Sequence, residues 1–191
     1  MKVGLFFGSF NPVHSGHLIV AGYMAEFTDL EQVWLVVSPQ NPMKLNEPLL
    51  QDYHRMTLVR EAVKDHRKLR ATDVEFRLAK PNYTINTLTH LREKFPQHEF
   101  VVIMGTDLLE TLTQWKSHEK ILENYFIYVY PRHKSSGGEM INHSHVKFID
   151  APLINISSTF IRQSIRDKKD VRYMMPESVW NYIEEMHFYE K

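Results

Sequence analysis

Residues 3–17 read VGLFFGSFNPVHSGH. The apolar run from Val3 to Phe7 is typical of a strand that is buried on both faces, and helical spacing of apolar residues follows between Ser15 and Phe27. A strand that turns through Gly8 and Ser9 into a helix points backbone N–H groups and the positive end of the helix dipole at one spot. Phosphate is the ligand that such a turn favours.

The same stretch places two histidines, His14 and His17, three positions apart and just after the Asn11-Pro12 step. Taken singly, each of these residues is explained by a structural role, because short motifs arise by chance. Taken together, they follow the carboxyl end of a buried strand, which is where open α/β sheets bind ligands. We interpret the combination as a nucleotide site.

Composition limits the kind of protein this is. The 191 residues are 43% hydrophobic, enough for one domain with a sizeable core. We expect residues 1–191 to form that single domain, with 157–191 as its C-terminal helical portion. The 23 basic residues balance the 23 acidic ones, so a nucleic-acid partner is not expected.

Cysteine is absent, which excludes disulfides, thiol nucleophiles and thiolate zinc sites. The chain shows neither a signal-peptide pattern nor an apolar run of membrane-spanning length. We therefore expect a cytoplasmic protein without a membrane partner. Its oligomeric state, monomer or homo-oligomer, stays open.

Strand-like and helix-like segments alternate along the chain, which predicts a parallel sheet. The predicted strands are Val3–Phe7, Val33–Val37, Leu69–Phe76, Phe100–Met104 and Phe126–Tyr130, and the predicted helices are Ser15–Phe27, Tyr53–Val63, Thr84–Lys94, Asp107–Trp115 and a last one opened by Pro176. In that last helix we expect Val179, Ile183 and Met186 to pack on the domain, with a dimer contact as the alternative. The fold class is α/β, a Rossmann-like doubly wound, mainly parallel sheet with a small C-terminal helical extension.

Two further groups of residues follow predicted strands. Lys44 ends a loop stiffened by two prolines and suits a phosphate, although a solvated surface lysine is the alternative. Gly105 allows close backbone approach, and Asp107 suits the hydroxyls of a ribose, unless it only caps a helix. Trp115 offers an aromatic face for stacking, with burial in the core as the alternative.

The last group begins near Ser157, where hydroxyls precede a helix. Ser158 and Arg162 then offer a hydroxyl and a guanidinium to a polyphosphate, the alternative being a capped helix with an exposed arginine. His133, His143 and His145 do not indicate a metal site, because carboxylate or cysteine partners at ligand spacing are missing.

With these motifs the chain resembles the nucleotidyltransferase superfamily marked by paired histidines, and within it most closely the bacterial nicotinate mononucleotide adenylyltransferases. The resemblance covers nearly the whole chain. It rests on residues 8–17, Lys44, Tyr83-Thr84-Ile85-Asn86-Thr87-Leu88, Met104 through Trp115, Ile156 through Arg162, and Arg172-Tyr173-Met174-Met175-Pro176.

The resemblance implies transfer of AMP from ATP to nicotinate mononucleotide, with Mg²⁺ accompanying ATP and no metal held by the protein itself. The segments that match Tyr83-Thr84 and Trp115 hold the pyridine ring in this family, and backbone N–H groups there bind its carboxylate. A cap on the following helix is the other explanation of Thr84. The implied catalytic residues are His14, His17, Lys44 and Arg162; the implied ATP-binding residues are Gly8, Ser9, Phe10, His17, Gly105, Asp107, Ser158 and Arg162; the implied acceptor-binding residues are Lys44, Tyr83, Thr84 and Trp115.

Four positions depart from the family's pattern: Phe7 replaces a glycine, Asn11 an aspartate, Met43 a histidine and Asn86 an aspartate. Phe7 and Asn11 bear on how the turn meets the triphosphate, and the other two on the mononucleotide pocket. Nicotinamide mononucleotide and phosphopantetheine are alternative acceptors, and a nucleotide sensor without catalysis is the alternative from another class.

Overall fold

Within residues 1–40 and 48–190, which the computed structural model describes, six strands form one parallel sheet in the order β3-β2-β1-β4-β5-β6. Their bounds are β1 Lys2–Gly8, β2 Gln32–Val37, β3 Leu69–Thr72, β4 Glu99–Gly105, β5 Phe126–Tyr130 and β6 Val146–Phe148. The order reverses direction between β1 and β4. This arrangement confirms the predicted doubly wound fold and leaves a crevice beside the carboxyl end of β1.

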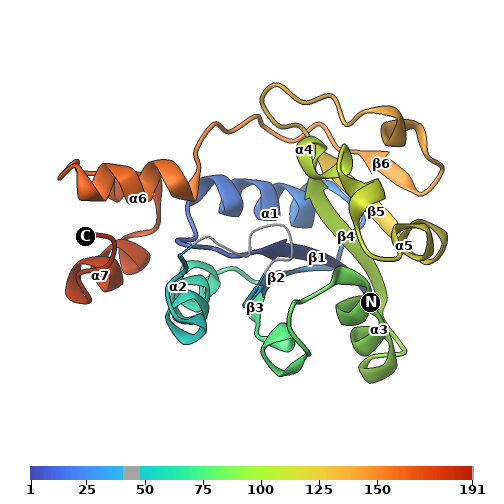
Figure 1. Cartoon of the computed structure of the whole chain (residues 1–191), viewed down its shortest axis with the longest axis horizontal. Coiled ribbons are helices and arrows are strands. Elements are labelled where there is room, and N and C mark those ends of the chain that lie inside the picture. Colours follow the sequence, from blue (N-terminus) through green and yellow to red (C-terminus); the bar gives the residue numbers. More distant parts are fainter. Residues whose placement is uncertain (41–47, 191) are drawn as a thin grey trace.

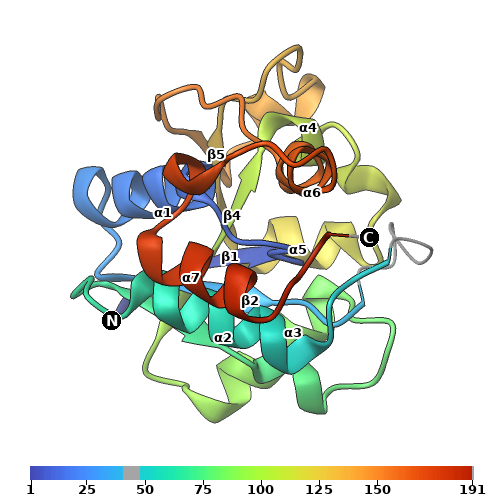
Figure 2. The same ribbon diagram turned by 90° about the vertical axis from the view of Figure 1, so that its left-hand side faces the viewer.

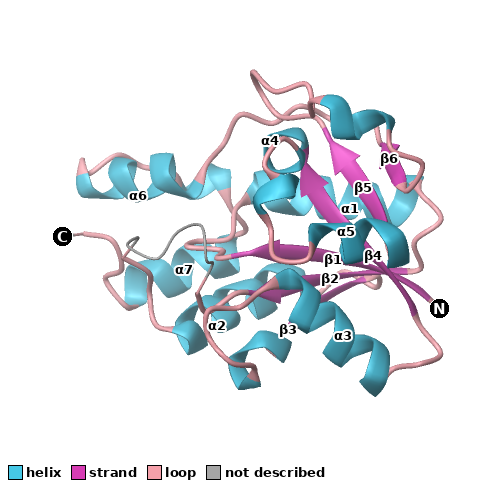
Figure 3. Ribbon diagram, turned by 45° about the vertical axis from the view of Figure 1, so that its right-hand side comes forward, coloured by secondary structure: helices cyan, strands magenta, loops and turns pink. Residues whose placement is uncertain are grey.

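Helices cover both faces of the sheet, as Figures 1 and 3 show. On one face lie α1 (Ser15–Phe27) and α2 (Asp52–Val63), together with α6 (Ser158–Arg166) and α7 (Glu177–Glu185) from the C-terminal part. On the other lie α3 (Thr84–Lys94), α4 (Thr106–Leu109) and α5 (His118–Asn124). Each layer of helices encloses its own apolar cluster against the sheet.

Strand β1 belongs to both clusters, as its apolar run predicts. Val3 and Leu5 are fully buried in the cluster beneath α3, whereas Phe6 is buried in the cluster beneath α1. Successive side chains of a strand point to opposite faces, so a strand between two layers of helices needs apolar residues at every position. The bounds of α1 agree with the predicted helix.

Two predicted elements are wrong in their extent. The predicted strand Leu69–Phe76 ends at Thr72, where the Thr72 hydroxyl accepts the Val74 N–H at 3.3 Å and a 3₁₀ turn begins. The predicted helix Asp107–Trp115 is broken after Leu109. There the Thr111 hydroxyl donates to the Leu108 carbonyl at 3.0 Å, and such a side-chain bond competes with the helix backbone.

The C-terminal helices pack back on the first layer. Figure 2 shows α7 beside α2, and the Ser178 hydroxyl at its start donates to the Glu61 carbonyl of α2 at 3.3 Å. Val179 and Ile183 are buried there as predicted, but Met186 is 40% exposed because α7 ends one residue before it. None of the helices in the part of the chain described is long and apolar enough to cross a bilayer.

Candidate active site

Two cavities flank the carboxyl end of β1. The first, which we call the histidine cleft, has a volume of about 270 Å³ and lies between α1, β4 and the start of α6. The second, the tryptophan pocket, has a volume of about 110 Å³ and lies at the start of α3. Phe7, Gly8 and Leu108 line both cavities.

The turn after β1 forms one wall of the histidine cleft through Gly8, Ser9 and Phe10. Phe10 adopts a positive φ of 45° and is 1% exposed, so its ring fills the space beside Gly8. A Cβ atom at Gly8 would lie 2.9 Å from that ring, which is closer than such atoms approach. Glycine is therefore required where the backbone passes the Phe10 ring.

His14 and His17 lie face to face in the cleft. Their ring centroids are 3.8 Å apart with an angle of 30° between the planes. The His14 backbone N–H donates to Nδ1 of His17 at 3.3 Å, and this bond leaves Nε2 of His17 to carry the ring proton. His14 is the N-terminal cap residue of α1, so both rings lie where the free N–H groups of that helix begin.

Both imidazoles are neutral near pH 7. Burial, and secondarily the charge of Arg132, lowers the pKa of His14 from 6.5 to about 4. Burial, followed by the charges of His14 and Arg132, holds the pKa of His17 well below its usual value. Each neutral ring has one N–H that can donate to an anion. A bound anion would raise the pKa of the rings and favour their charged forms.

Several elements contribute positive electrostatic potential to the cleft. Helices α1 and α6 both begin at it, and the Ser157 side chain caps α6 by accepting the Phe160 N–H at 3.1 Å. Ser158 donates its hydroxyl to the Pro12 carbonyl at 2.8 Å, which holds α6 against the turn. Helix N-termini and cations in one cleft favour a polyphosphate.

Arg162 and Arg132 are the arginines that line the described part of the cleft. Arg162 is half-buried and donates to the Asn11 carbonyl at 2.7 Å, so it is not merely an exposed arginine on a capped helix. Arg132 lies 3.7 Å from the carboxylate of Asp107. Asp107 also lines the cleft, and Gly105, not Asp107, is the cap residue of α4.

In the tryptophan pocket, Tyr83, Thr84 and Trp115 meet as the resemblance implies. Tyr83 is the N-terminal cap residue of α3 and no side chain caps this helix, so the alternative of Thr84 as a cap is wrong. The Asn86 N–H donates to the Tyr83 carbonyl at 2.9 Å, whereas the N–H groups of Thr84 and Ile85 lack intrahelical acceptors and are available to a ligand. Trp115 is half-buried, and the N–H of its indole has no hydrogen-bond partner among the described residues.

Glu75 and Asn82 shape the deep end of this pocket. Glu75 is 1% exposed, and one of its carboxyl oxygens accepts the Thr87 hydroxyl at 2.6 Å. Asn82 donates to the Glu75 carbonyl at 3.0 Å and accepts the Gln40 N–H at 3.3 Å. Burial raises the pKa of Glu75. These bonds fix the chain before α3 to the carboxyl side of β2.

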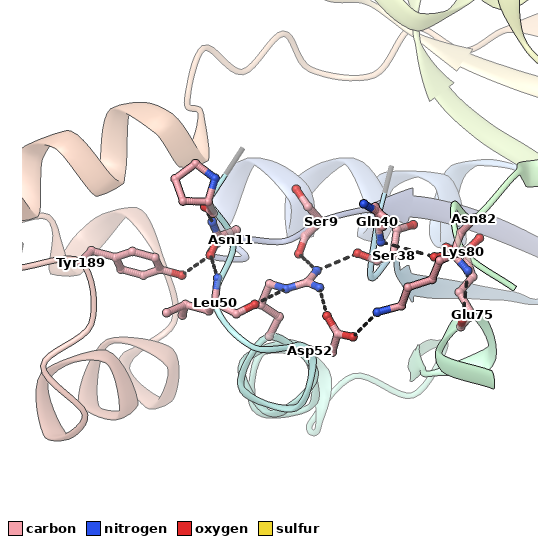
Figure 4. Close-up of polar contacts among 12 residues, drawn as sticks. Ser9, Asn11, Ser38, Gln40, Leu50, Asp52, Glu75, Lys80, Asn82 and Tyr189 are labelled. Atoms are coloured by element: carbon pink, nitrogen blue, oxygen red, sulfur yellow. Dashed lines mark hydrogen bonds and ion pairs between the residues drawn. The ribbon is translucent and has the colours of Figure 1, made fainter. Parts of the chain in front are cut away.

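A buried arginine joins the ends of β1 and β2. Arg55 has no exposed surface and donates to the carbonyls of Ser9 at 2.6 Å, Ser38 at 2.8 Å and Leu50 at 3.0 Å, and to Asp52 at 2.6 Å. Figure 4 shows these four partners around one guanidinium. The planar guanidinium has five donors, which suits several acceptors at once.

The side chain of Asn11 lies behind the cleft rather than in it. Its amide donates to the Pro48 carbonyl at 3.2 Å and accepts from the Leu50 N–H at 3.3 Å and the Tyr189 hydroxyl at 2.8 Å (Figure 4). An aspartate there could not donate to Pro48. The departure at Asn11 therefore bears on the support of the turn, whereas Phe7 lines both cavities.

Sequence reasoning missed Arg132, Lys116 and Glu75. Arg132 lies two residues after the predicted strand Phe126–Tyr130 and was open to the same argument as Asp107, while the other two carry no local signal. Lys44 and Met43 lie outside the described residues, and Asn86 is exposed on α3. Within residues 1–40 and 48–190, no three histidine, acidic or cysteine side chains are grouped to hold a metal ion.

Comparisons with known proteins agree with this geometry. The cytidylyltransferase-like family model matches residues 5–164. The chain is 52% identical to a probable nicotinate-nucleotide adenylyltransferase of Flavobacterium psychrophilum, over the full length of both chains. It is 42% identical to the probable nicotinate-nucleotide adenylyltransferase of Bacteroides thetaiotaomicron, over 97% of this chain and 92% of that one.

Solved structures agree in fold. The nicotinic acid mononucleotide adenylyltransferase of Plasmodium falciparum, complexed with NaAD, superposes with a TM-score of 0.84 at 19% identity, over 99% of this chain and 97% of that one. The chain belongs to the cytidylyltransferase-like family and, within it, to the nicotinate-nucleotide adenylyltransferases.

Proposed function

We propose that the chain transfers AMP from ATP to nicotinate mononucleotide, forming nicotinate adenine dinucleotide and pyrophosphate in NAD biosynthesis. The observation that carries this proposal is the pair of cavities on either side of the end of β1. One offers stacked histidines, arginines and helix N-termini to a triphosphate. The other offers Trp115 and the start of α3 to a pyridine ring.

The reaction needs no nucleophile from the protein. A phosphate oxygen of the mononucleotide attacks the α-phosphorus of ATP, one P–O bond forms, and the bond to the bridging oxygen breaks as pyrophosphate leaves with its electron pair. The second pKa of a phosphate monoester is about 6, so the attacking group is anionic near neutral pH. Catalysis then consists of alignment and stabilisation of developing charge.

The described residues divide this work. Nε2 of His17 donates to the triphosphate, and His14 stacks on the His17 ring and is proposed to donate beside it. The N–H groups that open α1 and the Arg132 guanidinium add positive potential. Arg162 binds phosphate oxygens and is held by Asn11. Lys44 is proposed as a further cation for both substrates, from the sequence alone. Gly105 and Asp107 are assigned to the nucleoside of ATP.

Mg²⁺ is proposed to enter with ATP. Asp107 is the only carboxylate among the described residues that line the histidine cleft, and its side chain is half exposed. Mg²⁺ keeps several waters and is commonly bound by one or two carboxylates plus substrate phosphates, so this donor set fits an ion carried by the triphosphate. When bound, the ion would neutralise charge on the leaving pyrophosphate.

The test compares acceptors. Purified protein is mixed with ATP, Mg²⁺ and nicotinate mononucleotide, nicotinamide mononucleotide or phosphopantetheine, and pyrophosphate release is measured while chromatography identifies the product. We expect the fastest turnover with nicotinate mononucleotide. Faster turnover with another acceptor would reassign the substrate, and no pyrophosphate with any of the three would indicate the non-catalytic sensor. A cytoplasmic location remains a prediction of the sequence.

A further inference from the structure

The tryptophan pocket carries one positive charge near its wall. Lys116 is the single basic side chain among its described lining residues. The Lys116 ammonium lies 4.6 Å from the centroid of the Tyr83 ring, so it is held over an aromatic face by a cation–π contact. Because Tyr83 is the cap residue of α3, this contact places the ammonium beside the start of that helix.

The ammonium has no anionic partner in the part of the chain that the structure describes. None of the ion pairs among those residues includes Lys116, and its neighbour Trp115 lines the pocket with it. A cation held in place by an aromatic ring and left unpaired is available to an incoming anion. Charge-assisted bonds of this kind are stronger than those between neutral groups.

The start of α3 adds to the same potential. Helix α3 has 11 residues, and its first turn leaves the N–H groups of Thr84 and Ile85 without intrahelical acceptors. Its dipole directs positive potential toward the pocket. Among the described lining residues Glu75 has the one carboxyl group, and that group accepts the Thr87 hydroxyl at the buried end. The pocket is therefore positive where Tyr83, Thr84 and Lys116 meet.

We propose that the Lys116 side chain selects nicotinate mononucleotide over nicotinamide mononucleotide by pairing with the pyridine carboxylate. This inference rests on the proposed function, and it assigns the choice of acceptor to a side-chain charge. The two mononucleotides have nearly the same shape and differ by one negative charge, a carboxylate against a neutral amide. An ammonium beside the ring distinguishes charge directly, whereas a neutral ring clamp does not.

Three variants test the proposal. Lys116→Met keeps the length of the side chain and removes its charge, Lys116→Arg keeps the charge, and Lys120→Met removes a charge from the exposed side of α5, away from the pocket lining. For each, kcat/KM is measured with both mononucleotides at saturating ATP and Mg²⁺, and equilibrium binding of each mononucleotide is measured by calorimetry.

We expect Lys116→Met to lower kcat/KM for nicotinate mononucleotide about tenfold, the scale of one partly exposed charge-assisted bond. The value for nicotinamide mononucleotide and the KM for ATP should stay within about twofold, well below that tenfold step. Lys116→Arg should keep most of the preference, and Lys120→Met all of it. The effect of added salt on binding of the acid should shrink in Lys116→Met.

An unchanged ratio of the two kcat/KM values in Lys116→Met would overturn the inference. So would an equal loss with both mononucleotides, because it would mean that Lys116 only supports the Tyr83 ring. Calorimetry separates this inference from the proposed function. A protein that binds the acid through Lys116 but releases no pyrophosphate would support the inference and contradict the function.

Discussion

The imidazole of His17 is oriented by the backbone of the turn in which it lies. Its Nδ1 accepts the His14 N–H, and its ring stacks on that of His14 and packs edge-on against Phe10, with centroids 5.0 Å apart. These contacts fix both the tautomer and the direction of the ring before a substrate binds. A donor fixed in advance loses little free energy to reorganisation when charge develops on a phosphate.

Replacing His17 by alanine is expected to lower kcat by a hundredfold or more, since losing such a donor raises the barrier by about 3 kcal/mol. The KM for ATP should change much less, because Arg132, Arg162 and the helix N-termini still bind the triphosphate. His90→Ala, on α3 and outside both cavity linings, is the matched control. Near-normal turnover of His17→Ala in steady-state kinetics would rule out the catalytic role.

The buried histidines also make stability depend on pH. Below about pH 6.5 the unfolded chain protonates its histidines, while folded His14 stays neutral down to a pKa of about 4. The unfolded state then binds more protons, so the unfolding free energy falls as pH decreases from about 7 to 4, by up to about 1.4 kcal/mol per pH unit for each such histidine.

Urea unfolding at about pH 7 and about pH 5 measures this slope. Burial lowers the pKa of His14, His17 and His54 in the described part of the chain. His14→Gln removes one of these groups and should show a shallower loss of stability on acidification than the unaltered chain. The matched control is His90→Gln, the same substitution on α3 outside both cavity linings. If His14→Gln and the unaltered chain lost the same free energy, the neutral burial of His14 would be wrong.

Some of these site residues could be predicted from the neighbouring sequence, and others depend on the tertiary fold. His14, His17 and Gly8 could be predicted because they lie within ten positions of one another, on a strand, turn and helix that the sequence pattern itself predicts. Arg132 follows a predicted strand as Asp107 does, but its pairing with the histidines depends on the strand order, which puts β5 two strands away from β1. The position of Lys116 in the tryptophan pocket depends on the end of α4 at Leu109, which hydrophobic periodicity did not predict.

At the scale of elements, polar side chains fix where the strands end. Arg55 in α2 donates to the carbonyls that follow β1 and β2. Glu75, between β3 and α3, accepts hydrogen bonds from Asn82 and Thr87. The predicted strand Leu69–Phe76 is too long for a related reason. The strand ends at Thr72, and the 3₁₀ turn that follows buries the Glu75 side chain, although apolar residues continue to Phe76. Hydrophobic periodicity describes which face a residue occupies and does not record which polar group is satisfied by which carbonyl.

Removing the Arg55 guanidinium should therefore destabilise the fold strongly. Arg55→Met leaves the buried Ser38 carbonyl and the partly buried Ser9 carbonyl without that donor, and an unsatisfied buried group costs about 1–3 kcal/mol. We expect a loss of about 3 kcal/mol or more in urea unfolding. Arg55→Lys should recover little, because an ammonium lacks the planar fork.

Arg60→Met, in the last turn of the same helix and exposed, is the control and should change the unfolding free energy by less than about 0.5 kcal/mol. A loss for Arg55→Met as small as that of the control would mean that water replaces the guanidinium at these carbonyls. The two variants remove the same charge from α2, so the comparison isolates the buried bonds.

At the scale of the molecule, the C-terminal part returns to the turn at residues 8–12. Ser158 and Arg162 of α6 bind the carbonyls of Pro12 and Asn11, and Tyr189 donates its hydroxyl to the Asn11 side chain. The turn is thus held by groups from well over a hundred residues further along the chain. Sequence patterns predicted the helices α6 and α7 but not this contact, which depends on where the last residues after α7 lie.

Tyr189→Phe tests whether that contact serves substrate binding. We expect it to lower the unfolding free energy by about 1 kcal/mol, the usual worth of one hydrogen bond, and to raise the KM for ATP by a few fold, since Asn11 also holds Arg162. Tyr182→Phe removes the hydroxyl that binds His54 at 2.9 Å, away from the turn.

Both tyrosine variants should lose similar stability, but only Tyr189→Phe should alter the KM for ATP, and neither should alter the KM for the mononucleotide. Steady-state kinetics with each substrate varied in turn provide the measurement. An equal KM for ATP in the two variants would show that the C-terminal contact is structural only.

Phe7, Gly8 and Leu108 line both cavities, and we call this shared wall the neck. Any molecule that occupies both cavities at once must contact these three residues, whereas a compound confined to the tryptophan pocket does not contact the paired histidines. Inhibitors of the two kinds would consequently select for resistance at different positions. Changes in the tryptophan pocket can redirect the choice of acceptor while the machinery of phosphoryl chemistry stays intact, but changes at the neck must satisfy both halves together.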